Sequence, residues 1–330
     1  MRVKAMRCHA FGPPENLVFE DIDLPAPGPG EALVRTERIG VNFPDGLIVE
    51  GGYQLKPPLP FTPGTEVSGE ILEARPAKGD SLPRFARPGD PVMAGMRTGA
   101  YAEAVIVPLA GVRPVPQGFS MSEAAGFRVA AQTAYVGLVE CGRLEAGETV
   151  LVLGAGSGVG RAAVQLAHAL GATVIATAST PAKRQSAIAA GAAHVIEATA
   201  DLKADVAALT DGRGIDIVYD PVGGDAFDQA IRTLGWRGRY LVVGFASGRI
   251  PTLSVNRALI KGLSVIGVRA GEYVRQNPDA GPRIQDAIEA LAVGGHMTPR
   301  IHAELPLADA ARALRLLGDR SVVGKLVLMP

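Results

Sequence analysis

An apolar strand pattern at residues 150–153 leads into a turn of small residues and then an amphipathic helical pattern. A buried strand that enters a helix through such a turn brings backbone N–H groups and the positive helix end against a pyrophosphate. The strict glycine fingerprint is absent, because its three positions, counted back from Gly160, hold Ala155, Ser157 and Gly160. A tight turn without a ligand is the alternative. The expected pyrophosphate-binding residues are Ala155, Gly156, Ser157, Gly158, Val159 and Gly160.

Strand and helix patterns alternate around this turn, and this context supports a dinucleotide-binding turn more strongly than the turn alone does. Continuous apolar strands that alternate with helices predict a parallel sheet covered on both faces, and therefore an α/β fold. The expected strands cover 149–153, 173–177, 194–196, 215–219 and 239–243. The expected helices cover 158–170, 181–190, 201–210 and 225–234.

The flanking regions have a different character. Residues 1 to about 125 are rich in Pro and Gly, with short β-branched runs between them, which predicts many short strands and little helix. A capping-box pattern at 120–123 then predicts a helix to about residue 141. After residue 268 we expect helices at about 282–293 and 306–318, and a final strand at 325–328.

The strand at 173–177 indicates which dinucleotide binds. An NAD-binding fold usually ends this strand with Asp or Glu, which accepts a hydrogen bond from the ribose 2′-hydroxyl. Here Ser179 follows the strand, and Lys183 and Arg184 come next. This strand end has no carboxylate that would repel a 2′-phosphate, and a cation can reach the phosphate. The pattern therefore favours NADPH. The alternative for the two cations is a solvated helix face.

Composition excludes several classes of protein. The chain has 330 residues, which suits two domains. Its 33 basic and 33 acidic residues cancel, so no general field attracts nucleic acid or an anionic membrane. No apolar run approaches the length of a membrane span. Two cysteines indicate a reducing compartment rather than a disulfide framework, so we expect a cytoplasmic protein.

Several motifs together resemble the medium-chain dehydrogenase/reductase superfamily, and within it the zinc-free quinone oxidoreductases that include zeta-crystallin. The motifs are GVNFPDGLIVEGGY (40–53), PPLPFTPGTEVSG (57–69), QTAYVGL (132–138), GETVLVLGAGSGVGRAAVQLA (147–167), DIVYDPVGG (216–224) and GRYLVVGFASG (238–248). The resemblance implies a Rossmann domain at 126–267 inserted into a GroES-like, β-rich catalytic domain made of 1–125 and 268–330. It also implies a homodimer paired through the strand near 263–268.

The resemblance also bears on metal. Zinc enzymes of this superfamily hold catalytic zinc with Cys and His from two motifs whose matching positions here are Asn42 and Thr65. Glu66 alone is not a zinc site, and two cysteines cannot form a four-cysteine lobe. We therefore expect no metal. Without a Lewis acid the substrate must already accept hydride readily, which favours quinones and enones over simple ketones.

The resemblance assigns roles to three residues of the catalytic site. Asn42 would contact the nicotinamide ribose and the reacting end of the cofactor; an Asx turn is the alternative. Tyr53 would line the quinone pocket and donate a hydrogen bond or a proton, although a packing role is nearly as well supported. Thr133 would face the nicotinamide, with an ordinary helix threonine as the alternative.

Two loops at the carboxyl ends of strands complete the expected cofactor site, because ligands bind at that edge of a parallel sheet. Ordinary turns are the alternative. The loop residues are Val222, Gly244, Phe245 and Ser247. By resemblance, Lys325 approaches the cofactor and could clamp its phosphates with Lys183; a solvated lysine is the alternative.

The expected function is therefore reduction of a quinone or similar small-molecule acceptor by NADPH. An enoyl or alkenal reductase, which would include acyl thioesters as substrates, is a second possibility. Arg269 would favour such a substrate with an anionic part, unless it lies on the surface. A low-turnover NADPH-binding protein is a third possibility.

Overall fold

The computed structural model describes residues 1–198 and 201–330. The chain forms two compact units. Unit 1 consists of Met1–Val129 and Pro299–Pro330, and unit 2 consists of Ala130–Thr298. The division falls within helix α2 (Met121–Tyr135), which continues as a π-helical segment, η3 (Val136–Cys141). The helix expected from residue 121 to about 141 is therefore present.

Unit 1 is built on a β-sheet that joins the two ends of the chain. Its order is β14-β15-β3-β4-β5-β7, and β6 also pairs with β3. The last strand lies antiparallel to β3, with Leu328 opposite Ile39, so the C-terminal segment completes the N-terminal sheet. A separate antiparallel pair joins β1 and β2. The strands are β1 (Arg2–Arg7), β2 (Val18–Asp23), β3 (Glu31–Val41), β4 (Glu66–Arg75), β5 (Pro91–Gly95), β6 (Ala104–Pro108), β7 (Val112–Pro114), β14 (Ile301–Pro306) and β15 (Lys325–Met329).

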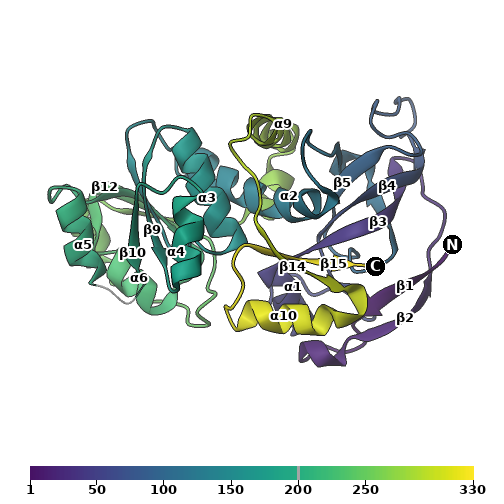
Figure 1. Ribbon diagram of the computed structural model, residues 1–330, viewed down its shortest axis with the longest axis horizontal. Coiled ribbons are helices and arrows are strands. Elements are labelled where there is room, and N and C mark those ends of the chain that lie inside the picture. Colours follow the sequence, from purple (N-terminus) through teal and green to yellow (C-terminus); the bar gives the residue numbers. More distant parts are fainter. Residues whose placement is uncertain (199–200) are drawn as a thin grey trace. The chain divides into compact units, whose positions relative to one another are not determined.

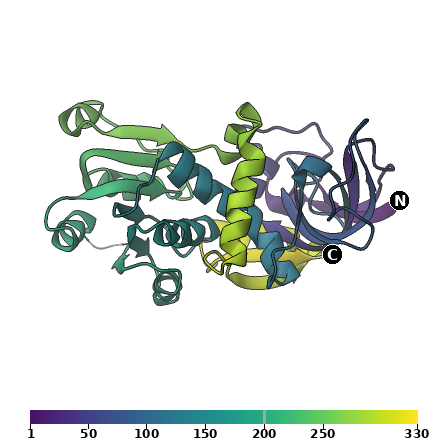
Figure 2. The ribbon, with the colours of Figure 1, turned by 90° about the horizontal axis from the view of Figure 1, so that it is seen from above.

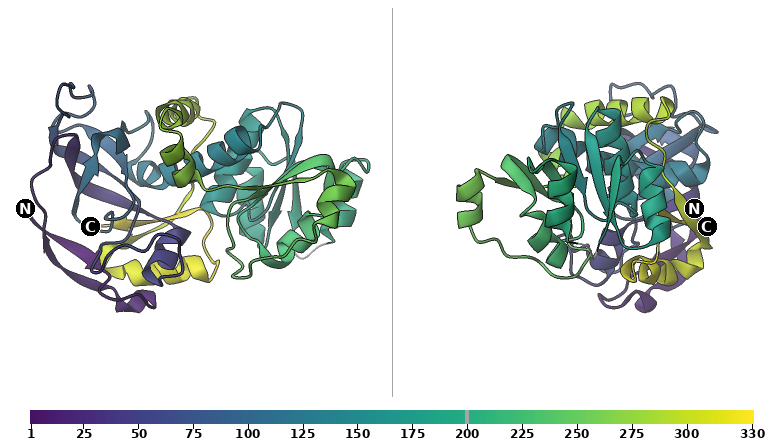
Figure 3. Two further views of the ribbon diagram at one scale, coloured as in Figure 1. Left: turned by 180° about the vertical axis from the view of Figure 1, so that it is seen from behind. Right: turned by 60° about the vertical axis from the view of Figure 1, so that its left-hand side comes forward.

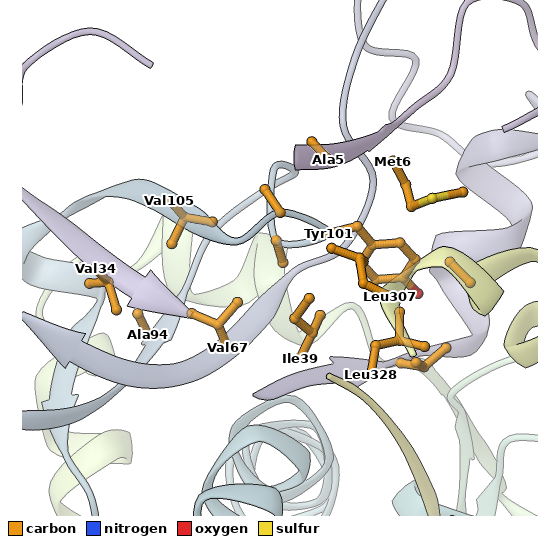
Figure 4. Close-up of a cluster of buried hydrophobic side chains, with 14 of the residues drawn as sticks. Ala5, Met6, Val34, Ile39, Val67, Ala94, Tyr101, Val105, Leu307 and Leu328 are labelled. Atoms are coloured by element: carbon orange, nitrogen blue, oxygen red, sulfur yellow. The ribbon is translucent and has the colours of Figure 1, made fainter. Parts of the chain in front are cut away.

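The core of unit 1 gathers apolar side chains from both ends of the chain. Figure 4 shows Ile39 from β3 and Leu328 from β15 beside the ring of Tyr101, which is fully buried. Short helices surround this core: η1 (Pro14–Asn16), α1 (Phe43–Val49), η2 (Leu109–Gly111), η4 (Leu307–Asp309) and α10 (Ala310–Gly318). The sequence predicted a helix from residue 306, but Pro306 ends β14 and the α-helix begins only at Ala310.

Unit 2 contains a six-stranded, fully parallel sheet in the order β10-β9-β8-β11-β12-β13. The strand order reverses between β8 and β11, which is where doubly wound sheets bind ligands. The right-hand view of Figure 3 shows these strands side by side. They are β8 (Thr149–Val152), β9 (Thr173–Ala178), β10 (His194–Glu197), β11 (Ile215–Asp220), β12 (Leu234–Val242) and β13 (Ser264–Gly267).

Helices cover this sheet in two groups. In Figure 1 the strands β9, β10 and β12 lie between α3 and α4 on one side and α5 and α6 on the other. The predicted parallel α/β arrangement is confirmed. The first helices are α3 (Gly158–Ala169), α4 (Pro181–Ile188), α5 (Leu202–Leu209) and α6 (Gly224–Ala230). The helix expected at 225–234 ends early, because β12 already begins at Leu234.

Residues 268–298 belong to unit 2 in the structure, whereas we expected them in the catalytic domain. Their helices are α8 (Ala270–Gln276) and α9 (Ala280–Val293, the long yellow-green helix in Figure 2); α7 (Asn256–Lys261) precedes them. Tyr273 donates a hydrogen bond to Glu140 (2.7 Å), and Arg283 pairs with the same carboxylate (2.8 Å). Gln285 donates to Gln132 at 2.8 Å. These contacts attach both helices to the start of unit 2.

Candidate active site and cofactor site

The glycine-rich turn between β8 and α3 is held by Ser157. Its hydroxyl donates to the Gly154 carbonyl (2.8 Å) and accepts from the Gly160 N–H (3.1 Å), which makes Ser157 the N-cap of α3. Both hydrogen bonds lie within the turn. The Ser157 side chain therefore shapes the loop, and its own N–H bonds to the Gly154 carbonyl at 3.0 Å.

Two positions in the turn admit only glycine. A Cβ atom on Gly160 would lie 2.3 Å from the Gly154 carbonyl oxygen, so helix and strand could not approach as closely. A Cβ on Gly156 would lie 2.5 Å from the Cγ of Lys183. In the described part of the chain, the N–H groups of Gly156, Gly158 and Val159 have no backbone acceptor. Amides at a helix N-terminus that point away from protein acceptors suit a pyrophosphate.

Lys183 lies directly against this turn. It belongs to the first turn of α4, where its N–H bonds to the Thr180 hydroxyl (3.3 Å), and its aliphatic stem packs over Gly156. Ser179, just after β9, is exposed. Arg184 instead pairs with Glu197 at 3.3 Å. Of the two cations that follow β9, Lys183 is the one beside the turn, and no carboxylate closes this strand. These residues fit a dinucleotide with a 2′-phosphate.

Sequence reasoning did not single out the buried carboxylate that shapes the next loop. Asp220 ends β11, and its Oδ1 accepts from the N–H groups of Val222 (2.7 Å) and Gly223 (2.9 Å). Tyr240 on the neighbouring strand donates to Oδ2 at 2.7 Å. Burial raises the pKa of Asp220 despite these donors. The signal was present in the sequence as an acidic residue at the end of an apolar strand.

The loop after β12 packs on the loop after β11. The N–H of Ser247 bonds to the Val222 carbonyl (2.9 Å), and that of Gly244 bonds to the Asp220 carbonyl (3.2 Å). Gly223 has a φ of +66°, and a Cβ there would lie 2.9 Å from the ring of Phe245. The structure thus brings the four predicted loop residues together at the carboxyl edge of the sheet, with Val222 next to the glycine-rich turn at Gly154.

In unit 1, Asn42 belongs to a buried polar network. Its Oδ1 accepts from the Lys325 ammonium (2.6 Å), and its Nδ2 donates to Glu66 (2.9 Å) and Thr65 (3.2 Å). The Lys325 ammonium also pairs with Glu66 at 2.8 Å. Asn42, Glu66 and Lys325 are 6%, 1% and 4% exposed, so this network operates away from water. The amide of Asn42 consequently has one fixed orientation.

The Lys325 ammonium therefore has two protein acceptors, and its contact with cofactor phosphates stays a prediction. The solvated alternative does not apply, because both acceptors of its ammonium are buried side chains. Glu66 is held further by the Val129 N–H, which donates to its second oxygen at 2.9 Å. The sequence identified Asn42, Glu66 and Lys325 separately but gave no indication that they touch.

A second buried carboxylate adjoins this network. Asp45, in the first turn of α1, accepts from the Asn42 N–H (2.9 Å) and from the Tyr101 hydroxyl (3.1 Å). Burial raises the pKa of Asp45 to about 7, although Asn42 and the Lys325 charge act in the opposite direction. Burial also raises the pKa of Tyr101. The single ammonium in this network is in direct contact with Glu66, which leaves Asp45 without a paired cation.

The other two predicted side chains are Tyr53 and Thr133. Tyr53 follows α1, is half-buried, and packs against the apolar core of unit 1. Thr133 lies in the part of α2 that belongs to unit 2 and is half-buried. Arg269, at the start of α8, is half-exposed and pairs with Glu272 at 3.6 Å. Arg269 therefore has a local partner on its own helix.

No group of three or more His, Cys, Asp or Glu side chains within the described residues has a metal-binding arrangement. At the two positions where the resemblance puts metal ligands, Asn42 and Thr65 are hydrogen-bonded to each other. None of the helices in the described ranges combines the length and the apolar composition that crossing a membrane requires.

Known proteins resemble the chain along its whole length. Residues 28–117 match the alcohol dehydrogenase GroES-like domain, and residues 158–286 match the zinc-binding dehydrogenase family. A quinone oxidoreductase-like protein 2 homolog from Nematostella vectensis is 34% identical over 98% of this chain and 88% of its own. A quinone oxidoreductase from Pseudomonas aeruginosa is 34% identical over 99% of both chains. A mycobacterial protein solved with NADPH is 31% identical, with a TM-score of 0.91 over 99% of this chain and 100% of its own.

Proposed function

We propose that this chain, which belongs to the quinone oxidoreductase family of medium-chain dehydrogenases/reductases, reduces quinones or similarly activated unsaturated carbonyl compounds. Its fold is the GroES-like domain with a Rossmann-type parallel sheet that this family shares. Family membership establishes an oxidoreductase, and the choice of acceptor is our proposal.

One observation carries the proposal. By the motif resemblance, Asn42 and Thr65 stand at the positions where zinc-dependent members hold their metal, and both are engaged in hydrogen bonds in this structure. Neither an amide nor a threonine hydroxyl is a usual zinc ligand. A site that polarises a carbonyl with hydrogen bonds alone provides less stabilisation than a Lewis acid, so its substrate must already be a good hydride acceptor. We therefore propose a zinc-independent enzyme that acts on quinones or enones.

The cofactor is NADPH, which similar solved structures from mycobacteria and Escherichia coli hold. In this chain the amides of Gly156, Gly158 and Val159 would hold its pyrophosphate, and Lys183 would pair with its 2′-phosphate. The loop residues Val222, Gly244, Phe245 and Ser247, together with Ser179 and Thr133, complete the proposed binding set. When bound, NADPH supplies the hydride.

The residues of unit 1 would position the reacting end of the cofactor and donate a proton to the acceptor. The Lys325 and Glu66 contacts fix the amide of Asn42, so that it can orient the nicotinamide end of the cofactor without reorganising. Tyr53 has a hydroxyl on a partly buried ring and would donate to the acceptor oxygen as charge develops there. Neither cysteine is assigned a role; burial raises the pKa of both Cys8 and Cys141, which disfavours a nucleophilic thiolate.

The test is NADPH oxidation followed at 340 nm against quinones, enones, enoyl thioesters and simple ketones. We expect kcat/KM to be highest for quinones and negligible for ketones, and to survive dialysis against a strong chelator. Higher kcat/KM on enoyl thioesters would select the enoyl-reductase alternative. Binding of NADPH without turnover on any acceptor would indicate a low-turnover binding protein.

We also propose a homodimer that forms through unit 2. β13 is an edge strand of the six-stranded sheet, and the adjacent segment exposes Val255, Leu259 and Ile260 by 81%, 82% and 68%. Open edges and contiguous apolar surface are typical of subunit contacts. Sedimentation should give twice the chain mass, and Leu259→Asp should lower the measured mass to that of the monomer.

We also propose a cytoplasmic location, which the two free cysteines support.

A further inference from the structure

A pocket of about 330 Å³ lies at the amino-terminal edge of the unit 2 sheet. It is bounded by α5, by the loop that leads into β11, by the start of β12 and by the end of α7. We call it the amino-edge pocket. Its volume is at the lower end of the roughly 300–1,000 Å³ typical of small-molecule sites. The cofactor residues of unit 2 follow the carboxyl ends of the same strands, so the two sites lie at opposite ends of β11 and β12.

Four cations line this pocket, and its lining contains no acidic residue. They are Lys203, Arg213, Arg232 and Lys261. In the parts of the chain that the structure describes, none of the four forms an ion pair. Like charges gathered around one hollow repel one another, and an anion bound between them removes that repulsion. The lining therefore favours an anionic ligand.

The backbone holds part of this charge in place. The Lys261 ammonium donates to the Leu234 carbonyl (2.5 Å) and to the Arg232 carbonyl (3.4 Å), and Arg213 donates to the Thr210 carbonyl (3.3 Å). Two cations are thus anchored, while the exposed side chains of Lys203 and Arg232 can turn toward a ligand. Guanidinium and ammonium groups in this combination recognise phosphate oxygens.

Trp236 gives the pocket an aromatic wall. It is the one tryptophan of the sequence, it lines the pocket, and it is 74% exposed. An indole in this position offers a flat face on which an aromatic or heterocyclic ring can stack, as in sites that pair aromatic side chains with cations. The two features complement each other, because the cations suit a phosphate and the indole suits a ring attached to it.

We propose that the amino-edge pocket binds a phosphorylated heterocyclic compound of mononucleotide size, at a site separate from the NADPH site. The phosphate lies among the cations and the ring stacks on Trp236. A six-residue strand such as β11 spans about 20 Å, so the ligand does not reach the cofactor loops at its other end.

Trp236 makes the proposal directly testable, because all tryptophan fluorescence arises at the pocket. The protein is titrated with each of the four nucleoside 5′-monophosphates at constant ionic strength, with NADP⁺ present in saturating amount to occupy the cofactor site. We expect saturable quenching of Trp236 by at least one of them. The matching nucleoside and inorganic phosphate should each bind at least about tenfold more weakly, since each lacks one half of the recognition.

The Lys203→Ala/Arg232→Ala double variant should raise the Kd at least about tenfold and keep the wild-type melting temperature, because both side chains are exposed. Arg237→Asn is the matched control: it removes a charge beside Trp236 that does not line the pocket, and asparagine tolerates the positive φ of 61° there. This control should bind like the wild type.

Three results would overturn the proposal. The first is no saturable quenching by any of the four nucleotides. The second is an equal loss of affinity in Lys183→Ala, which would place binding at the cofactor site. The third is Trp236 emission that changes with protein concentration and not with nucleotide, which would make this face a subunit contact.

Discussion

Replacing Lys325 by methionine should destabilise unit 1 strongly, because it leaves a buried carboxylate without its cation. Glu66 is 1% exposed and pairs with the Lys325 ammonium at 2.8 Å. Removing one partner of a buried ion pair costs about 3–5 kcal/mol. Methionine preserves the apolar stem of the side chain, so the loss reports the charge and its hydrogen bonds rather than a cavity.

Two further donors moderate the loss. The Nδ2 group of Asn42 and the N–H of Val129 still bond to Glu66, each at 2.9 Å, so its charge keeps partial compensation. We therefore expect Lys325→Met to lose about 3 kcal/mol, the lower end of the range. The Glu66→Gln/Lys325→Met double variant removes both charges and should recover at least about 1 kcal/mol of that loss.

Urea unfolding measured with two probes tests this expectation. Trp236, the only tryptophan, reports unit 2, whereas far-ultraviolet circular dichroism reports both units. The Lys325→Met transition should move to lower urea in circular dichroism and separate from the fluorescence transition, since two units need not unfold together. A stability within about 0.5 kcal/mol of the wild type, or a double variant less stable than the single one, would refute the argument.

Three other changes test the site and its electrostatics. Lys183→Ala should weaken NADPH binding by about 1–3 kcal/mol in calorimetry and leave NADH binding unaffected. Arg184→Ala is the control and should change neither affinity, because the Arg184 side chain pairs with Glu197. Equal binding of NADH and NADPH by the wild type would contradict this expectation. Tyr53→Phe should lower kcat/KM for the quinone about tenfold and spare NADPH binding, and a silent change would place the proton donor elsewhere. Because burial raises the pKa of Asp45 from 3.8 to about 7, the folded state retains its proton, and stability should fall as pH rises from about 4 to about 7. Asp45→Asn should flatten the stability profile in this window; an unchanged profile would show that other groups cause it.

Much of unit 2 was predictable because its determinants are local. The apolar strands and the small residues at 154–160 each specify structure within a few residues, and the parallel sheet follows from the alternation of strands with helices. The preference for a 2′-phosphate depended on the residues after β9, which are also local. The structure adds that Lys183 packs on the turn itself.

Contacts between distant segments could not be predicted in the same way. Residues 268–298 form helices that the apolar pattern indicated in part, but nothing in that pattern says which unit they pack against. The Arg283 and Tyr273 contacts to Glu140 decide it, across more than 130 residues. The same holds for the hydrogen bond between Asp220 and Tyr240, which lie on neighbouring strands 20 residues apart in the sequence.

The network around Asn42 shows how this limit affects the interpretation of function. Lys325 lies 283 residues after Asn42, and the family resemblance implied a phosphate partner for it. The pairing of β15 with β3 places Leu326 opposite Val41, one residue from each member of the pair, so their meeting is a consequence of strand register. The register thus gives this lysine a contact that fixes the neighbouring amide, and its approach to the cofactor stays a prediction. The ion pair gives the Asn42 amide one fixed orientation, which the proposed zinc-free site needs if it is to act through hydrogen bonds alone.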